Sequence, residues 1–313
     1  MPSTISRARG VWDPVMSEPD SDTYGRGIAM SALGMLILSP DTLLLRMVSQ
    51  GSSFWDVLFF RSLFIFLALL AYLAVRHRQG LWGIFTNMGR AGLIATGLMT
   101  ANNITFVAAI ALTSVANVLV MLATMPFFGA VLGWLMIGER VKRRTGISIF
   151  LAFIGIVVIF SGSLGKGNGI GDVIALVTAF LMGLNLVLLR KYKGQDVIPQ
   201  AFCLSGLLVA LIVLPLASPA LVPFADIKYL MLMGGIVVPV SMVLFFGGAR
   251  HAPAAEIALL SLIETVLGPI WVWIGVAEVI PTMTFIGGGI VIVAVAGNAW
   301  VGLRTGRRKI LVP

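Results

Sequence analysis

The sequence predicts an all-α integral membrane protein, and the observations behind this are its composition and the length of its apolar runs. Of 313 residues, 58% are hydrophobic and 11% are charged, and the mean hydropathy is +1.01. An ordinary soluble domain could not hide this much apolar surface from water. In lipid, backbone polar groups must be satisfied within each segment, so helices of about 20 apolar residues are expected. A lipid-facing barrel would instead show alternating segments of about 10 residues.

Ten apolar runs are long enough to be transmembrane helices, and charged or turn-rich breaks separate them. The break between the third and fourth runs is only Thr113 and Ser114, but length requires it, because the whole stretch is about twice what one span can use. The ten runs are 25–47, 54–75, 91–112, 114–137, 145–163, 172–189, 200–216, 229–249, 254–276 and 282–303.

The basic residues predict which way the chain crosses the membrane. Most of the 22 Lys and Arg lie on alternate connections and on the two tails, and the richest connection is GERVKRR at 138–144. Cytoplasmic connections carry an excess of Lys and Arg, so both termini are expected in the cytoplasm. The net charge of +9 is therefore assigned to orientation. Nucleic acid is not an expected partner, because these bases do not form a face on a soluble module.

A weak internal repeat relates the two halves of the chain. When Glu139 is placed over Glu278, Trp134 falls on Trp273 and the apolar runs around them align. Equivalent points are five helices apart, and because five is odd, equivalent connections lie on opposite sides of the membrane. This explains why GERVKRR is basic while its counterpart, AEVIPTM, contains no base. Such inverted repeats serve alternating access in secondary transporters.

These patterns predict the domain organisation. Residues 1–24 carry Pro, Ser and acids without an apolar core, so they are expected to be a cytoplasmic tail and not a signal peptide. Residues 25–163 and 172–303 are the two predicted five-helix repeats, and 304–313 is a basic cytoplasmic tail.

Two stretches resemble a known family signature, with small residues, a mid-helix proline and a helix end like LGE. The first is TSVANVLVMLATMPFFGAVLGWLMIGERVKRR, from Thr113, and the second begins APAAEIALLSLIETVLGPIWVWIG, from Ala252. They resemble the EamA family of the drug/metabolite transporter superfamily. The resemblance extends over nearly the whole chain, from Gly25 to Leu303. It implies a ten-helix permease of the bacterial inner membrane that exports amino acids, drugs or other metabolites.

The sequence offers few groups for metal, redox or nucleotide chemistry. Cys203 is the single cysteine, and His77 and His251 both lie at the ends of apolar runs beside arginines. No metal site and no cofactor are therefore expected. No G-x-x-x-x-G-K-[ST] motif occurs, so ATP is not expected as the direct energy source. The chain is not expected to be an enzyme.

Glu264 is the leading candidate for substrate binding or proton coupling. An ionisable residue at the bilayer centre costs about 2.5–3.5 kcal/mol on insertion scales, so such residues are functional candidates. Glu264 lies about halfway along its run, with no helix end beside it that would explain the charge. At helical spacing it shares a stripe with Ile257, Ser261 and Gly268, a narrow polar seam suited to line a cavity.

Two further acids lie inside the runs, each with a structural alternative. Asp41 lies toward the outer end of the first run. Its alternative role is structural, as the partner of Arg46 or Arg61 in an ion pair between helices. Glu256 follows Pro253 at a helix start, where the helix dipole alone could account for it. Both remain candidates for the site.

Uncharged polar residues within the runs are weaker candidates for the same site. Asn side chains often join membrane helices as structural glue worth about 0.6–2 kcal/mol, so both roles stay open. Across the inversion Asp41 aligns with Asn185, and Asn117 with Glu256, so one polar pair falls toward the outer face and its counterpart toward the inner face, and two gates could be built this way. The candidates are Asn102, Asn103, Asn117, Thr124, Asn185, Ser241 and Ser261.

Two prolines predict helix breaks at mid-membrane depth. Pro126 and Pro269 each remove a backbone donor, which frees the carbonyls of Leu122 and Thr265. Broken turns are tolerated where they line a cavity and so mark a binding site, although a passive bend is the alternative. Nearby apolar residues that suit a ligand body, or simply the core, are Met121, Met125, Phe127, Phe128, Phe245 and Phe246.

The sequence thus predicts a secondary transporter of a small metabolite that is amino-acid-like, cationic or zwitterionic, or drug-like. An exporter is favoured, with protons as the candidate coupling ion. The central site is expected from the first, third, fourth, sixth, eighth and ninth runs. Membrane lipid is the expected surrounding, and a homodimer stays open. One alternative is a membrane scaffold or assembly protein without flux. The other is an intramembrane enzyme, which would need a convergent set of catalytic groups.

Overall fold

The structure of the chain is a computed structural model that describes eight stretches of the sequence. Within them the regular elements are helices and no strand occurs, which confirms the predicted all-α class. Most of the tail 1–24, part of the tail 304–313 and Glu278 lie outside the described residues. The described stretches are 21–48, 52–77, 80–113, 115–160, 169–192, 197–219, 222–276 and 282–308.

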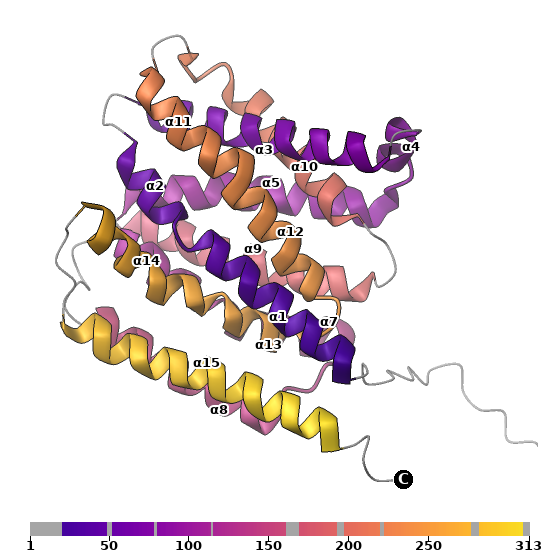
Figure 1. The fold of residues 1–313 in the computed structure, drawn as a ribbon, viewed down its shortest axis with the longest axis vertical. Helices are drawn as coiled ribbons and strands as arrows, with labels where there is room; N and C mark the ends of the chain where they lie inside the picture. The colour runs from indigo at the N-terminus through magenta and orange to yellow at the C-terminus, as the bar shows by residue number, and fades with distance from the viewer. Residues whose placement is uncertain are drawn as a thin grey trace, which may run out of the picture.

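The helices follow the predicted apolar runs in order, and several runs are divided into two elements. Figure 1 shows the chain running back and forth, with the start of α1 and the end of α15 at the same end of the molecule. The elements are α1 Ser21–Leu38, α2 Asp41–Met47, α3 Phe54–Arg76, α4 Leu81–Thr86, α5 Gly89–Leu112, α6 Val115–Leu122, α7 Met125–Ile137, α8 Arg143–Phe160, α9 Gly169–Lys191, α10 Ile198–Val213, α11 Phe224–Leu232, the π-helical turn η2 Met233–Val237, α12 Val238–Gly248, α13 Ala254–Leu260, α14 Leu262–Val276 and α15 Thr282–Arg308.

Six helical stretches of the described residues are long and apolar enough to cross a membrane, which supports an integral membrane protein. They are Asp22–Leu45, Phe54–Arg76, Gly89–Leu112, Gly169–Lys191, Phe224–Gly248 and Ala254–Gly275. Three further apolar helical segments are shorter, namely Met125–Ile137, Ile198–Val213 and Ile286–Gly302. The sequence did not predict α4, a short helix without buried residues in the connection between α3 and α5.

The first run breaks at Ser39 and Pro40, between α1 and α2. A proline has no N–H and its ring displaces the carbonyl one turn earlier, here that of Leu36. The Ser39 hydroxyl donates to the Leu36 carbonyl over 2.8 Å, and Ser39 Oγ accepts a bond of 2.7 Å from the Trp271 indole. The freed carbonyl is therefore satisfied inside the protein, as a membrane requires.

The fourth and ninth runs also break, but only one break lies where proline predicted it. Ala123 and Thr124 separate α6 from α7, directly before Pro126. The break predicted at Pro269 was wrong, because α14 continues past that residue and the interruption lies about two turns earlier, at Ser261. There the Ser261 hydroxyl donates to the Ala258 carbonyl over 2.7 Å and competes with the helical hydrogen bonds.

Four helix pairs pack most extensively: α8 with α15, α3 with α10, α1 with α12, and α5 with α9. In Figure 1 α8 and α15 lie side by side along the lower edge of the molecule. Gly155 on α8 permits this close approach, because a Cβ atom there would lie 2.7 Å from the Gly287 carbonyl oxygen of α15. Small residues serve the same purpose in membrane helix packing generally.

We expect Gly155→Ala to lower the free energy of unfolding by about 1–3 kcal/mol, because the added methyl must push α15 away from α8. The matched control is Gly146→Ala on the same helix, where an added Cβ would have no neighbour within 4 Å. The control should be neutral or stabilising by up to about 1 kcal/mol, since Ala is the better helix former. Thermal unfolding in detergent measures both, and equal effects would contradict the assigned contact.

Candidate functional site

A central cavity of about 610 Å³ lies among nine helices, which belong to eight of the ten predicted runs. This volume is the whole space between the lining atoms and includes space open to solvent. Beyond the six runs expected to build the site, α3 and α10 also contribute. Its polar lining is Asp41, Arg61, Asn102, Asn103, Asn185 and Glu264, and its apolar lining is Leu38, Ile65, Met99, Phe106, Leu122, Met182, Phe202, Val238, Met242 and Phe246.

Arg61 is buried at the edge of the cavity and is held by three partners. Its Nη2 lies 3.0 Å from Asp41 Oδ2, an ion pair in which both side chains are almost fully buried. Its Nη1 donates to Asn103 Oδ1 over 3.0 Å, and its guanidinium lies 5.5 Å from the Phe106 ring centre. Asn103 is oriented in turn by a bond of 3.0 Å to the Ser62 hydroxyl. The pair expected for Asp41 is therefore made with Arg61.

Glu264 lines the same cavity and is 8% exposed. Because the run breaks at Ser261, Glu264 lies in the first turn of α14, with its N–H bonded to the Ser261 carbonyl over 3.1 Å. The expectation that no helix end lies beside Glu264 was wrong for this reason. The partial positive charge at a helix N-terminus favours a carboxylate there. The break thus supplies a reason why an acid is tolerated at this depth.

Several polar atoms at the cavity are buried without a hydrogen-bond partner among the described residues. They are Asp41 Oδ1, Arg61 Nε, Asn102 Oδ1 and Asn185 Oδ1. Buried polar atoms of this kind are rare in folded proteins and call for a ligand, an ion or water. They occur together on one cavity, so the cavity is equipped to hold a polar solute.

The remaining sequence candidates lie away from the cavity lining. The hydroxyls of Thr124, Ser241 and Ser261 each donate to a carbonyl within their own turn, those of Met121, Val238 and Ala258. Asn117 belongs to α6, but its side chain is outside the described part of the chain. Pro126 is the second residue of α7, and Pro269 lies within α14.

Glu256 belongs to a second polar cluster, which joins three helices. It is 2% exposed, in the first turn of α13. Its carboxylate accepts a hydrogen bond of 2.5 Å from the Tyr24 hydroxyl of α1 and forms an ion pair of 2.7 Å with Arg144 of α8. Gly302 of α15 leaves the room for Tyr24 and Arg144, since a Cβ atom there would collide with both.

Glu139 and Arg190 form a third cluster, at the same end of the bundle. α7 ends at Gly138, whose φ of +68° is the left-handed conformation of a helix C-cap. The chain then brings Glu139 to Arg190 of α9, whose Nε donates to its carboxylate over 2.6 Å. Arg190 also donates to the carbonyls of Ala249 and Ala252 in the turn before α13. Three separate elements are therefore tied together here.

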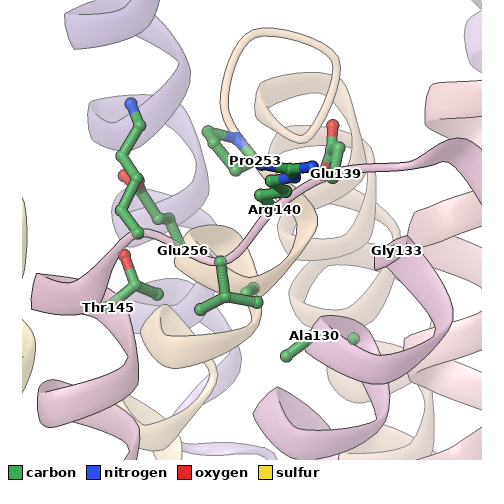
Figure 2. A pocket seen from close by; sticks show the side chains of 11 residues that line it. Ala130, Gly133, Glu139, Arg140, Thr145, Pro253 and Glu256 are labelled. Atoms are coloured by element: carbon green, nitrogen blue, oxygen red, sulfur yellow. The ribbon is translucent and has the colours of Figure 1, made fainter. Parts of the chain in front are cut away.

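A pocket of about 290 Å³ lies between these two clusters, and Figure 2 shows it from close by. Glu139 and Pro253 lie near one side of the pocket, and Glu256 and Thr145 near the other. Both carboxylates are already engaged by arginines. We therefore assign this pocket to the junction of the helix ends, with the central cavity as the candidate binding site.

His251 lies in the turn between α12 and α13, beside the Glu139 cluster. Burial, and then the charges of Arg250 and Arg190, lower the pKa of His251 below its ordinary value. Because that ordinary value is about 6.5, the imidazole is neutral at pH 7. It adds no positive charge next to Arg190.

Sequence reasoning missed most of the apolar lining, although a signal was present. Of the apolar residues proposed from the sequence, only Phe246 lines the cavity. Three of the lining residues that were missed share a helix face with a polar lining residue: Met99 and Phe106 each lie one turn from Asn103, and Met182 lies one turn from Asn185. A search for Met and Phe at these spacings from an intramembrane Asn would have found them.

Comparisons with known proteins agree with the sequence and the fold. The model of the EamA-like transporter family matches residues 25–161. A comparison with curated proteins finds no match. Among solved structures, one whose title reads only "Crystal structure of protein" has a TM-score of 0.74 at 14% identity, over 88% of this chain and 98% of that chain. At this identity the likeness shows the fold alone.

We expect Asp41→Asn and Arg61→Met each to lower the free energy of unfolding by about 3–5 kcal/mol, because each leaves a buried partner unpaired. The double variant should lose much less than the sum of the two, since it buries no uncompensated charge. Denaturant unfolding in detergent, followed by tryptophan fluorescence, measures the four proteins of the cycle. Additive losses would show that the pair is not coupled.

Proposed function

We propose that this chain is a secondary transporter of a small metabolite, since residues 25–161 match the model of the EamA-like transporter family, which belongs to the drug/metabolite transporter superfamily. The central cavity is the substrate site, and it is exposed alternately to the two sides of the membrane. We further propose export across a bacterial inner membrane, with both termini in the cytoplasm. The single observation that carries the proposal is a central cavity lined by unpartnered buried polar atoms and set among apolar helices.

The proposed architecture is ten spanning helices in two inverted repeats. The packing supports it. If each helix is exchanged with its counterpart five spans away, the contact of α1 with α12 becomes the contact of α9 with α5. The contacts of α3 with α10 and of α8 with α15 are unchanged by this exchange. The cavity supports it as well. The lining comes from the first four predicted runs of the first half, through α1, α2, α3, α5 and α6, and from the first four runs of the second half, through α9, α10, α12 and α14.

Alternating access requires that each end of the bundle can close. The clusters of Glu139 with Arg190 and of Glu256 with Arg144 join elements of the first half to elements of the second. Both lie at the end that carries the basic connection 138–144, which we assign to the cytoplasm. Exposure of the cavity to that side requires these pairs to separate. We therefore propose that they form the cytoplasmic gate.

Protons are the proposed coupling ion, and Glu264 is the proposed carrier. The charged groups that share the cavity with it are Asp41 and Arg61, which are already paired with each other. The Glu264 carboxylate accepts no hydrogen bond among the described residues, so it is free to bind a proton or to face a solute. Binding one of these excludes the other, which is the exchange that a coupled carrier needs.

Inverted topology predicts opposite labelling of two equivalent connections. Cys203 is buried, so an added cysteine can be read against a low background. Arg140→Cys should react with a membrane-impermeant maleimide only in inside-out vesicles, and Glu278→Cys only in right-side-out vesicles. Arg304 directly follows the last predicted run, so Arg304→Cys should be labelled from the same side as Arg140→Cys. Reaction of the first two from the same side would remove the inverted repeat.

Glu264→Gln should abolish coupled flux. A metabolite-library thermal-shift screen on purified protein selects the solute, and proteoliposomes then measure its flux at two pH values. The variant should fall to the rate of empty liposomes and lose its dependence on pH, because the amide can neither carry a proton nor balance a charge. Asp22→Asn, an exposed acid in the first turn of α1, is the matched control. Unchanged flux in Glu264→Gln would refute the proposed coupling role of Glu264. If the parent protein transports no solute at all, the alternative of a membrane scaffold without flux is favoured.

A further inference from the structure

The charges of the central cavity leave room for one positive charge. Asp41, Arg61 and Glu264 are its ionisable lining residues. Arg61 and Asp41 neutralise each other at 3.0 Å, so Glu264 is the remaining charged group. A solute cation opposite the Glu264 carboxylate makes the filled cavity neutral, whereas a solute anion adds a second negative charge in a low-dielectric site. Burying an uncompensated charge is costly, so the cavity discriminates against anions.

The unpartnered polar atoms of the cavity are mostly acceptors. Asp41, Asn102 and Asn185 each present a buried Oδ1 without a partner, while Arg61 contributes a single free donor, Nε. Asp41 and Asn185 are each 2% exposed, so bulk water does not satisfy them. Acceptors left unpaired in a buried site favour a ligand rich in N–H donors. A primary ammonium carries three such donors, and a quaternary ammonium carries none.

The rest of the lining suits an apolar body attached to that ammonium. Three methionines and three phenylalanines line the cavity, from four different helices: Met99, Phe106, Met182, Phe202, Met242 and Phe246. Methionine adapts to irregular ligands, and phenylalanine gives large apolar contact surface. The Phe106 ring already faces the Arg61 guanidinium, which leaves the other rings for the solute.

From these three features we infer that the cavity binds an organic cation made of a protonated primary amine on an aromatic or aliphatic body. The ammonium donates to the carboxylate of Glu264 and to the amide oxygens of Asn102 and Asn185. The Asp41–Arg61 pair sets the charge balance of the cavity. This inference rests on the proposed function and specifies its substrate class, because it separates cations from the zwitterions, anions and neutral solutes that the family resemblance leaves open.

The test is isothermal titration of the purified full chain in detergent with four matched probes. Phenethylamine supplies the primary ammonium and an aromatic body, and its N,N,N-trimethyl derivative keeps the charge without N–H donors. Phenylpropanoate reverses the charge, and phenylalanine is the zwitterion. We expect phenethylamine to bind at least about tenfold more tightly than the other three, the difference expected when a buried charge or its donors are lost.

Variants assign the contact to the cavity. Glu264→Gln and Asn185→Leu should each weaken the binding of phenethylamine by about tenfold or more. Asn185→Asp should retain or tighten this binding, since the aspartate keeps the acceptor oxygen and adds a negative charge. The matched control is Thr178→Val on the same helix, whose hydroxyl is bonded to the Ile174 carbonyl. It should leave binding unchanged. Melting temperatures without ligand show which variants are folded. If Asn185→Leu does not fold, Asn185→Asp still tests the role of this position.

Three outcomes overturn the inference. One is binding of phenylpropanoate, phenylalanine or the trimethyl derivative as tight as that of phenethylamine, and another is no saturable binding of phenethylamine at millimolar concentration. The third is a folded Glu264→Gln that binds it as the parent does. None of these touches the transporter proposal, which stands or falls on flux of a screened solute in proteoliposomes. Flux of an anion that ignores Glu264→Gln would refute the cation class and keep the transporter.

Discussion

The burial of the Arg61 guanidinium is the constraint on which the centre of this protein depends. A cation in the middle of an apolar bundle requires a counter-charge, and Asp41 supplies it at 3.0 Å. It also requires its other N–H groups to be directed, and Asn103, oriented by Ser62, takes one of them. This set of contacts joins α2, α3 and α5 and forms one wall of the cavity. Because Arg61 is already balanced, Glu264 can face the solute.

Interrupted helices supply the polar groups of this centre. Asp41 follows the break at Pro40, and Glu264 follows the break at Ser261, so both acids lie in the first turn of a helix that begins inside the bundle. A helix start provides free N–H groups and a favourable dipole for a carboxylate. The breaks are held by local bonds, such as those of Ser39. The same device that admits charge to the membrane thus also places it on the cavity.

The sequence allowed part of the site to be predicted, and the reasons for success and failure are physical. Asp41, Glu264, Asn102, Asn103 and Asn185 stand out as polar residues in apolar runs, and the structure brings all five to one cavity. Thr124, Ser241 and Ser261 stand out equally, but a hydroxyl can bond to its own turn and need not face a cavity. Composition cannot separate these two uses of a polar side chain.

Apolar composition and the length of the runs fix the solvent and the helical class, because the backbone polar groups of each segment must be satisfied in lipid. The stretches from Thr113 and Ala252 indicate the family, and the model of the EamA-like transporter family matches residues 25–161. The position of the break in the ninth run, at Ser261 and not at Pro269, is visible only in the folded chain. Tertiary contacts likewise paired Glu139 with Arg190 and Glu256 with Tyr24 and Arg144. Partners so far apart in the chain meet only after the helices have packed, so no local pattern records them.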